Sequence, residues 1–282
     1  TEIYTLSLHD ALPISYGNNP SGIYVHTMEN SIVEYCVFDR NGMDGEYTGD
    51  MHNVHIMPLS DYKYADGDYN HETNYWRESC HIENNTYRYN YLKNTDGITH
   101  TGIRHKAQQW LTPTITIDWT HEDLGDKIHH NIFENLASNG VVSEHDFLQV
   151  HHNIAINCSL LAGNTTPYGA APQCGVFYNN TIIGGIIATG WDGEGVSSCT
   201  QTPYNWWYNN LIDQPSESST HHALTLRTVL ATCSINDDRI DIDHNYVYRD
   251  DDTYMIRYYE NDTGTLFTAA TYNSAYSKTN YS

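Results

Sequence analysis

Short apolar runs broken at Asn and Gly make up most of this chain, and they lack the spacing of an amphipathic helix. The clearest case is IHHNI at 128–132, which returns 22 residues later as VHHNI at 150–154. Self-similarity at a fixed period of this size is typical of a solenoid. Asn and Gly tolerate the left-handed backbone conformation that a sharp bend between strands requires. The pattern therefore predicts an all-β chain in which each unit is one coil of a parallel β-helix, with Asn131 and Asn153 stacked roughly 4.8 Å apart in adjacent coils.

The same pattern recurs along most of the chain, with an Asn at the equivalent position of each copy: Asn90, Asn131, Asn153, Asn180, Asn210 and Asn245. The steps between these positions are 41, 22, 27, 30 and 35 residues. The step of 41 residues corresponds either to two coils or to one coil with a long insertion. An earlier segment, 32–38, fits the pattern with Cys36 in the Asn position. Stacked Asn side chains hydrogen-bond between neighbouring layers of cross-β structures, so we expect an Asn column that joins the coils.

Strand alternation predicts which side chains of the repeat face the core. We expect Ile132 and Ile154 to face inward, and one histidine of each adjacent pair, 129–130 and 151–152, to face inward while the other faces outward. An outward column of imidazoles could share a metal ion, although no third ligand is evident in the sequence. The alternative is a column of stacked histidines with a purely structural role.

The ends of the chain depart from the repeat. Residues 1–15 resemble a translated sequencing adapter, so we exclude them from the fold prediction and expect them to pack poorly or to remain detached from the coils. No initiator Met is present, so we expect the natural protein to begin further upstream. Residues 16–252 are predicted to form one β-helix domain, and 253–282 either a cap for the solenoid or the start of a missing downstream region. No apolar run approaches 18 residues, so no membrane span is predicted.

Charge and cysteine content narrow the classes of function. The chain has 35 Asp and Glu against 13 Lys and Arg, a net charge of −22 that disfavours nucleic acid as a partner. Cys36 and Cys158 lie in apolar runs and are predicted to be buried thiols. Cys174, Cys199 and Cys233 lie near predicted turns and could form disulfides. Composition and predicted fold favour an extracellular or cell-surface location, which the cysteines permit.

A long acidic segment, 43–79, interrupts the repeat. Ordered loops of this length tend to be functional. Asp66, Asp68 and Glu72 present oxygen ligands at nearly alternate positions, which is compatible with a calcium site because Ca²⁺ takes six to eight oxygens. The spacing does not match an EF-hand, and the alternative is a solvated acidic loop.

Basic residues gather in the segment GIRHK at 102–106. With Ile103 inward, Arg104 and Lys106 face solvent on one side of the strand and His105 faces oppositely. Lys127 follows Lys106 by 21 residues, about one coil, so we expect the two to stack. In so acidic a protein such a patch would attract an anion, and the alternative is a set of surface salt bridges.

Aromatic residues are frequent in the second half of the chain. Trp191, Trp206 and Trp207 are candidates for stacking on sugar rings, since flat aromatic faces suit that contact. Some of these aromatic residues must instead close the core.

The repeated coils with His-His-Asn and the GIRHK segment resemble the right-handed parallel β-helix proteins of the pectate-lyase-like superfamily, over about residues 16–250. The resemblance implies a single-stranded right-handed solenoid with loop insertions. Members of this superfamily mostly cleave acidic polysaccharides. Residues 94–97, NTDG, also look like a signature of the polygalacturonase hydrolases, but the paired-Asp and Gly-His-Gly elements that should follow are absent.

The alginate- and chondroitin-cleaving lyases of this superfamily are similar in using a Lys base with a basic partner about one coil away. The resemblance therefore implies a secreted polysaccharide lyase that acts on uronate polymers by β-elimination. Lys106 would remove the proton, Arg104 or a calcium ion would neutralise the carboxylate, and Lys127 or His105 would assist the leaving oxygen. The partner is usually Arg, whereas this chain has Lys127. The alternative is a non-catalytic, adhesin-like or fibre-forming extracellular solenoid, because fold alone does not establish activity.

Overall fold

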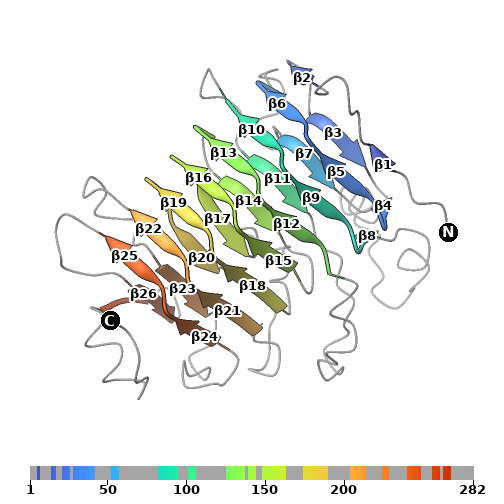
Figure 1. Ribbon diagram of the computed structural model, residues 1–282. Helices are drawn as coiled ribbons and strands as arrows, with labels where there is room; N and C mark the ends of the chain where they lie inside the picture. The colour runs from blue at the N-terminus through green and yellow to red at the C-terminus, as the bar shows by residue number, and fades with distance from the viewer. Residues whose placement is uncertain are drawn as a thin grey trace, which may run out of the picture.

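The computed structural model describes residues 5–6, 14–16, 21–25, 28–41, 52–56, 82–94, 101–105, 125–136, 139–143, 148–162, 174–189, 204–213, 224–228, 240–248, 256–260 and 263–267. These residues form β-strands and the bends between them, which confirms the all-β prediction for the part of the chain that the structure describes. The strands lie in three long sheets and one short one, and the long sheets are stacks of parallel strands apart from one antiparallel strand at the C-terminal end (Figure 1). This arrangement is consistent with a β-helix.

The strands of each sheet, in spatial order, are as follows. Sheet A contains β1 (Thr5–Leu6), β5 (Ile32–Glu34), β9 (Thr86–Arg88), β12 (Lys127–His129), β15 (Leu148–His151), β18 (Cys174–Tyr178), β21 (Tyr204–Tyr208) and β24 (Ile240–Asp243). Sheet B contains β2 (Ile14–Tyr16), β6 (Val37–Asp39), β10 (Tyr91–Lys93), β13 (Ile132–Glu134), β16 (Ile154–Ile156), β19 (Thr181–Ile183), β22 (Leu211–Asp213) and β25 (Tyr246–Tyr248). Sheet C contains β3 (Ser21–Val25), β7 (His52–Ile56), β11 (Thr101–His105), β14 (Asn139–Ser143), β17 (Ser159–Ala162), β20 (Ile187–Thr189), β23 (Leu224–Thr228), β26 (Ile256–Glu260) and β27 (Thr263–Phe267). The short sheet pairs β4 (Met28–Glu29) with β8 (Ile82–Glu83).

Successive long-sheet strands enter sheets A, B and C in turn, so one strand of each makes a rung that stacks on the rung before it (Figure 1). Strand β9 pairs directly with β12, and β10 pairs with β13. The 41 residues between Asn90 and Asn131 are therefore one rung with a long insertion rather than two coils.

The bend between sheets A and B has the same form in seven consecutive rungs. Two residues separate the strands, as Tyr35 and Cys36 do between β5 and β6. The first of the two has φ between 53° and 56° in every case: Tyr35, Tyr89, His130, His152, Asn179, Asn209 and His244. The second is the residue of the predicted Asn column.

The Asn column is a buried ladder of hydrogen bonds. Asn131 donates from its backbone N and its Nδ2 to Oδ1 of Asn153, at 3.0 and 3.1 Å. Asn153 makes the same two bonds to Asn180, both at 3.1 Å. At the start of the ladder, the backbone N of Cys36 donates to Oδ1 of Asn90 at 3.0 Å. The predicted stacking of Asn131 on Asn153 in adjacent coils is confirmed.

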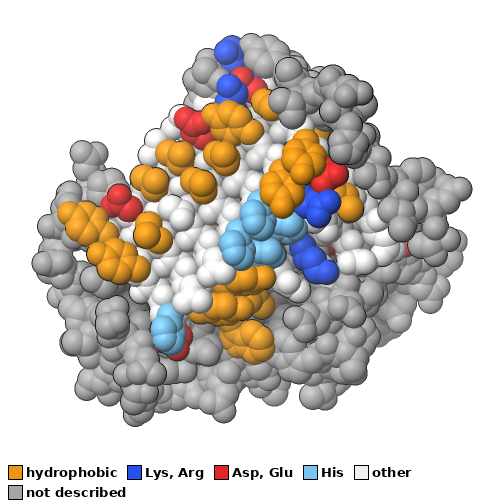
Figure 2. All heavy atoms as spheres, viewed as in Figure 1, with side chains coloured by type: hydrophobic (Ala, Val, Ile, Leu, Met, Phe, Trp, Pro, Cys, Tyr) orange, Lys and Arg blue, Asp and Glu red, His pale blue; other side chains and the backbone are white. Residues whose placement is uncertain are grey.

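The expected direction of the neighbouring isoleucines is wrong. Ile132 and Ile154 face outward and are 39% and 40% exposed, whereas Phe133 and Ala155 are fully buried. The left-handed residue at the bend interrupts the alternation of inward and outward side chains along the sheet A strand. The alternation starts again at Asn131, which faces inward, so the next residue, Ile132, faces outward. Outward apolar side chains of this kind form part of the surface in Figure 2.

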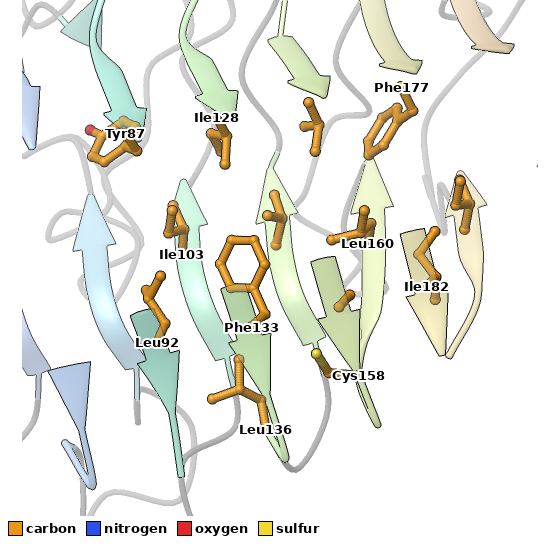
Figure 3. Packing of buried hydrophobic residues seen from close by; sticks show 14 of the residues in the cluster. Tyr87, Leu92, Ile103, Ile128, Phe133, Leu136, Cys158, Leu160, Phe177 and Ile182 are labelled. Carbon is orange, nitrogen blue, oxygen red and sulfur yellow. The ribbon is translucent and has the colours of Figure 1, made fainter. Parts of the chain in front are cut away.

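The core is one cluster of buried apolar side chains that all three long sheets supply, and Figure 3 shows part of it. In one part of it, Ile128 from sheet A, Phe133 from sheet B and Ile103 from sheet C are buried together. The inward direction expected for Ile103 is confirmed. Cys36 and Cys158 are free buried thiols, as predicted. Of the possible disulfide cysteines, Cys199 and Cys233 lie outside the described residues, as does the side chain of Cys174.

The two ends of the stack differ. Strands β1 and β2 pair in parallel with β5 and β6, so Thr5–Leu6 and Ile14–Tyr16 are not detached. The rest of residues 1–15 lies outside the described residues, and the resemblance to an adapter stays a prediction. The open edge of a sheet offers unpaired backbone groups to any segment that can extend. At the other end β26 continues sheet C in parallel with β23, and β27 then reverses to pair antiparallel with β26. The described residues contain no helix long and apolar enough to cross a membrane.

Candidate functional site

Four histidines gather on the outer surface at the bend between sheets A and B, and we call His129, His130, His151 and His152 the histidine quartet. His129 and His151 are half-buried at the ends of β12 and β15, and the other two are exposed. The expectation that one histidine of each pair faces inward is wrong. His130 and His152 adopt the left-handed conformation of the bend, at φ 56° and 55°, and the inward position passes to the following Asn.

The quartet is a two-by-two array of rings. Along the stack, His129 lies on His151 with ring centroids 4.8 Å apart, and His130 lies on His152 at 5.0 Å, with the two rings of each pair nearly parallel. Within a rung the two rings are almost perpendicular. Their Nδ1 atoms approach to 2.8 Å in the first rung and 2.9 Å in the second. At these distances one nitrogen of each pair donates a proton and the other accepts it.

Tyrosines continue the array in both directions. Tyr89 lies against His130 with centroids 5.2 Å apart and the rings tilted by 40°, and Tyr35 stacks on Tyr89 at 5.2 Å. On the other side Tyr178 stacks on His151 at 4.5 Å, and Tyr208 on Tyr178 at 5.1 Å. Figure 2 shows the histidines in the middle of this face with apolar and aromatic side chains to either side. Because the rings cover one another's faces, they leave mainly their edges, which carry nitrogen and hydroxyl groups, to a ligand.

Two cations border the quartet. Lys127 is two residues before His129 on β12, so both face outward from the same strand. Arg88 is in register with His129 on the neighbouring strand β9. The Arg88 guanidinium lies 2.7 Å from Glu34 and 5.7 Å from the ring centre of Tyr89. The described face therefore carries positive groups in a chain whose net charge is −22.

The surroundings keep the half-buried imidazoles neutral. Burial, and then the electrostatic effect of a proton on His130 and of Arg88, lower the pKa of His129 to about 4. Burial, and then the other three histidines and Lys127, lower the pKa of His151 to about 3. Burial followed by His152 also lowers the pKa of His130. Near neutral pH these rings are hydrogen-bonding bases rather than cations.

Of the residues predicted as a catalytic group, the structure describes the side chains of Arg104 and Lys127, and these two lie in different sheets. Arg104 lies in sheet C, in register with His55 on one side and Val142 on the other, with its Nε buried. Lys127 lies in sheet A, in register with Thr86 and Gln149. Lys127 therefore does not pair with strand β11, because β11 belongs to sheet C and β12 to sheet A, while Lys106, on which Lys127 was expected to stack, lies outside the described residues. Lys106 and the side chain of His105 lie outside the described residues.

The glycine of the GIRHK segment has a packing role. A Cβ on Gly102 would lie 2.5 Å from the carbonyl oxygen of Gly140 and 2.8 Å from Cδ1 of Phe133. The close approach of two neighbouring strands over a large core ring thus explains this part of the motif without reference to chemistry.

The structure tests only some of the residues predicted to contact sugar or metal. Trp207 is fully buried and packs edge-on against Phe177, so its expected contact with a sugar is wrong. Trp206 faces the other side of β21 and is half-buried. Trp191 and the three candidate calcium ligands, Asp66, Asp68 and Glu72, lie outside the described residues. Within the described part of the chain, no group of three or more His, Cys, Asp or Glu side chains is arranged to hold a metal ion.

The sequence did contain a signal for the full array. When the copies are aligned on their Asn, the position before it holds Tyr35, Tyr89, His130 and His152 in consecutive rungs. The position before that holds His129, His151, Tyr178 and Tyr208. Comparison of the chain with protein-family models, curated proteins and solved structures finds no match.

Proposed function

We propose that this chain is a secreted, right-handed parallel β-helix of the pectate-lyase-like kind that binds uronate-containing polysaccharide and cleaves it by β-elimination. One observation carries the proposal: neutral imidazoles lie beside Lys127 and Arg88 on a single face of a strongly acidic protein. A polymer of carboxylates is attracted to such a face and repelled by the rest of the surface.

The groups on this face match the needs of the reaction. A β-elimination removes the proton from the carbon that bears the carboxylate, and the released electron pair forms a double bond as the adjacent carbon–oxygen bond breaks. His129, unprotonated near neutral pH, accepts the proton. Arg88 has donors beyond those that contact Glu34, and these neutralise the carboxylate as negative charge develops on it. Lys127 donates a proton to the leaving glycosidic oxygen.

The test is release of unsaturated product, followed by the absorbance of the new double bond, from alginate, pectate and glycosaminoglycan, with and without added calcium. We expect the wild-type protein to release product from at least one polymer and Lys127→Ala to lose at least tenfold in rate. Lys93→Ala is the matched control, since Lys93 lies 3.6 Å from Asp39 on sheet B, away from the quartet. It should keep the wild-type rate. Absence of product from the wild-type protein on every polymer would refute the proposal.

The site implied by the family resemblance stays a separate prediction. Lys106→Ala should abolish product release if the base belongs to the end of strand β11. A loss with Lys106→Ala and full activity with Lys127→Ala would place the reaction on sheet C rather than on the quartet.

A non-catalytic solenoid is the second candidate function, and specific contacts favour it. Arg88 is paired with Glu34, and the four histidines are bonded and stacked among themselves. An array that satisfies its own polar groups is sufficient for a structural or adhesin-like surface. The same product assay separates the two functions, because a structural array predicts binding of polymer at most and no unsaturated product.

A further inference from the structure

We infer that each adjacent histidine pair of the quartet is a chelating site for a transition-metal ion that prefers tetragonal coordination, such as Cu²⁺. The ligands are the two Nδ1 atoms of one rung, His129 with His130 or His151 with His152. This inference does not rest on the proposed lyase activity and is tested without any polymer.

The separation of the nitrogens carries the inference. The two Nδ1 atoms are 2.8 Å apart in one rung and 2.9 Å apart in the other. Two ligands at right angles on a metal, with metal–nitrogen bonds of ~2.0–2.1 Å, are separated by about 2.9 Å, whereas tetrahedral ligands are separated by about 3.4 Å. The pairs therefore have the bite of cis ligands in a square or tetragonal ion, which is the geometry typical of Cu²⁺ and Ni²⁺.

Sharing of an ion along the stack fits less well. Stacked rings are parallel and 4.8–5.0 Å apart between centroids, so their nitrogens are parallel neighbours rather than groups aimed at one point. The histidines of one rung are nearly perpendicular and in nitrogen contact, so rotation of each ring by about 45° turns its Nδ1 from the other nitrogen towards a common ion. With two protein ligands in each pair, water completes the coordination.

A metal ion takes the place of the proton that the two Nδ1 atoms of a pair share. Only the single proton shared between the two Nδ1 atoms must move, and it can move to a ring Nε2.

The two pairs are not equivalent. Nε2 of His152 lies 3.2 Å from Nδ2 of Asn179, so the amide donates and His152 holds its proton on Nδ1. To bind a metal through Nδ1, His152 must give up that arrangement, whereas among the described residues His130 has no such bond to Nε2. We therefore expect the first ion at His129 and His130. Repulsion between two dications about 5 Å apart weakens the second binding by roughly tenfold to a hundredfold.

The experiment is a titration of metal-free, untagged protein with Cu²⁺, followed by calorimetry and by electron paramagnetic resonance. We expect one tight equivalent whose spectrum shows two coordinating nitrogens. Zn²⁺ should bind at least tenfold more weakly. The double variant His130→Gln with His152→Gln should lose at least tenfold in Cu²⁺ affinity.

His244→Gln is the matched control. His244 occupies the same bend position in a later rung but contacts Asp243 at 2.8 Å instead of a histidine, so this variant should bind Cu²⁺ as the wild type does. Undiminished affinity in the double variant, or a tight Cu²⁺ signal without two nitrogens, would overturn the inference. The nitrogen count is made on the unmodified protein, so it decides the matter even where a variant does not fold.

Discussion

Replacement of Asn153 by alanine should destabilise the protein far more than an average substitution, because it removes the middle of the buried Asn ladder. Oδ1 of Asn153 accepts two bonds from Asn131, and its Nδ2 donates to the carbonyl oxygen of Ile128 and to Oδ1 of Asn180, at 2.9 and 3.1 Å. Alanine keeps the backbone N–H bond to Asn180 and loses all four of these contacts.

The size of the destabilisation follows from the buried polar groups that lose their hydrogen-bond partners. The backbone N–H of Asn131 remains buried without its acceptor, which costs ~1–3 kcal/mol, and each of the other lost bonds contributes ~0.5–1.5 kcal/mol. Nδ2 of Asn131 keeps its bond to the carbonyl oxygen of Tyr87, which limits the loss. We expect the free energy of unfolding to fall by about 3–5 kcal/mol, against about 1 kcal/mol for a typical substitution.

Urea denaturation followed by far-ultraviolet circular dichroism measures this change. Ile154→Thr is the matched control at the next residue, since that side chain faces outward and remains β-branched. It should change the free energy by no more than ~0.5 kcal/mol. A decrease below ~1 kcal/mol for Asn153→Ala, or equal decreases for the two variants, would refute the account of the ladder as a main source of stability.

Two further predictions concern the core and the quartet. Phe133→Ala should lower the free energy of unfolding by ~3–5 kcal/mol because its ring is fully buried, whereas Ile132→Ala should lower it by less than ~1 kcal/mol; urea midpoints compare them. His129 and His151 have pKa values lowered to about 4 and about 3 from 6.5, so the unfolded chain binds protons first as the pH falls. The stability due to their neutral forms is complete above pH 6.5 and is lost towards pH 3, so the double variant to Gln should flatten the pH dependence of the urea midpoint in this range.

Each of these two predictions can be contradicted by experiment. Equal effects of the two core variants would mean that the assigned inward and outward faces of β13 are wrong. An unchanged pH profile in the double histidine variant would mean that other groups account for any acid sensitivity.

The sequence was sufficient for the rungs and for the Asn ladder. Asn returns in each copy between two apolar runs, and its side chain can both donate and accept, so a column such as Asn131 on Asn153 could be predicted. The direction of Ile132 could not, because a left-handed conformation is uncommon at His130, which is not Gly. Once that bend is known, counting back from Asn210 places Trp207 in the core without further information.

The candidate site was harder to predict than the fold. Lys127 follows Lys106 by nearly one period, yet the residues between them are an insertion, and the length of a loop cannot be told from the length of a coil in a single copy. The quartet depends on contacts between residues 22 apart and on both members of each pair facing outward. The 22-residue repeat predicted the contacts between rungs. Strand alternation did not predict that both histidines of a pair face outward.

The constant bend between sheets A and B makes this edge of the protein a regular array of equivalent, substitutable positions. Connections elsewhere in the rung vary widely in length, but here two residues always intervene from β5–β6 to β24–β25. The rings already present are 4.5–5.2 Å apart along the file. Residues that differ as much as Tyr35, His130, Asn179 and His244 share one backbone conformation. Substitutions at this position, one in each rung, could therefore place a chosen series of side chains along this edge, while the buried Asn residues maintain the spacing between rungs.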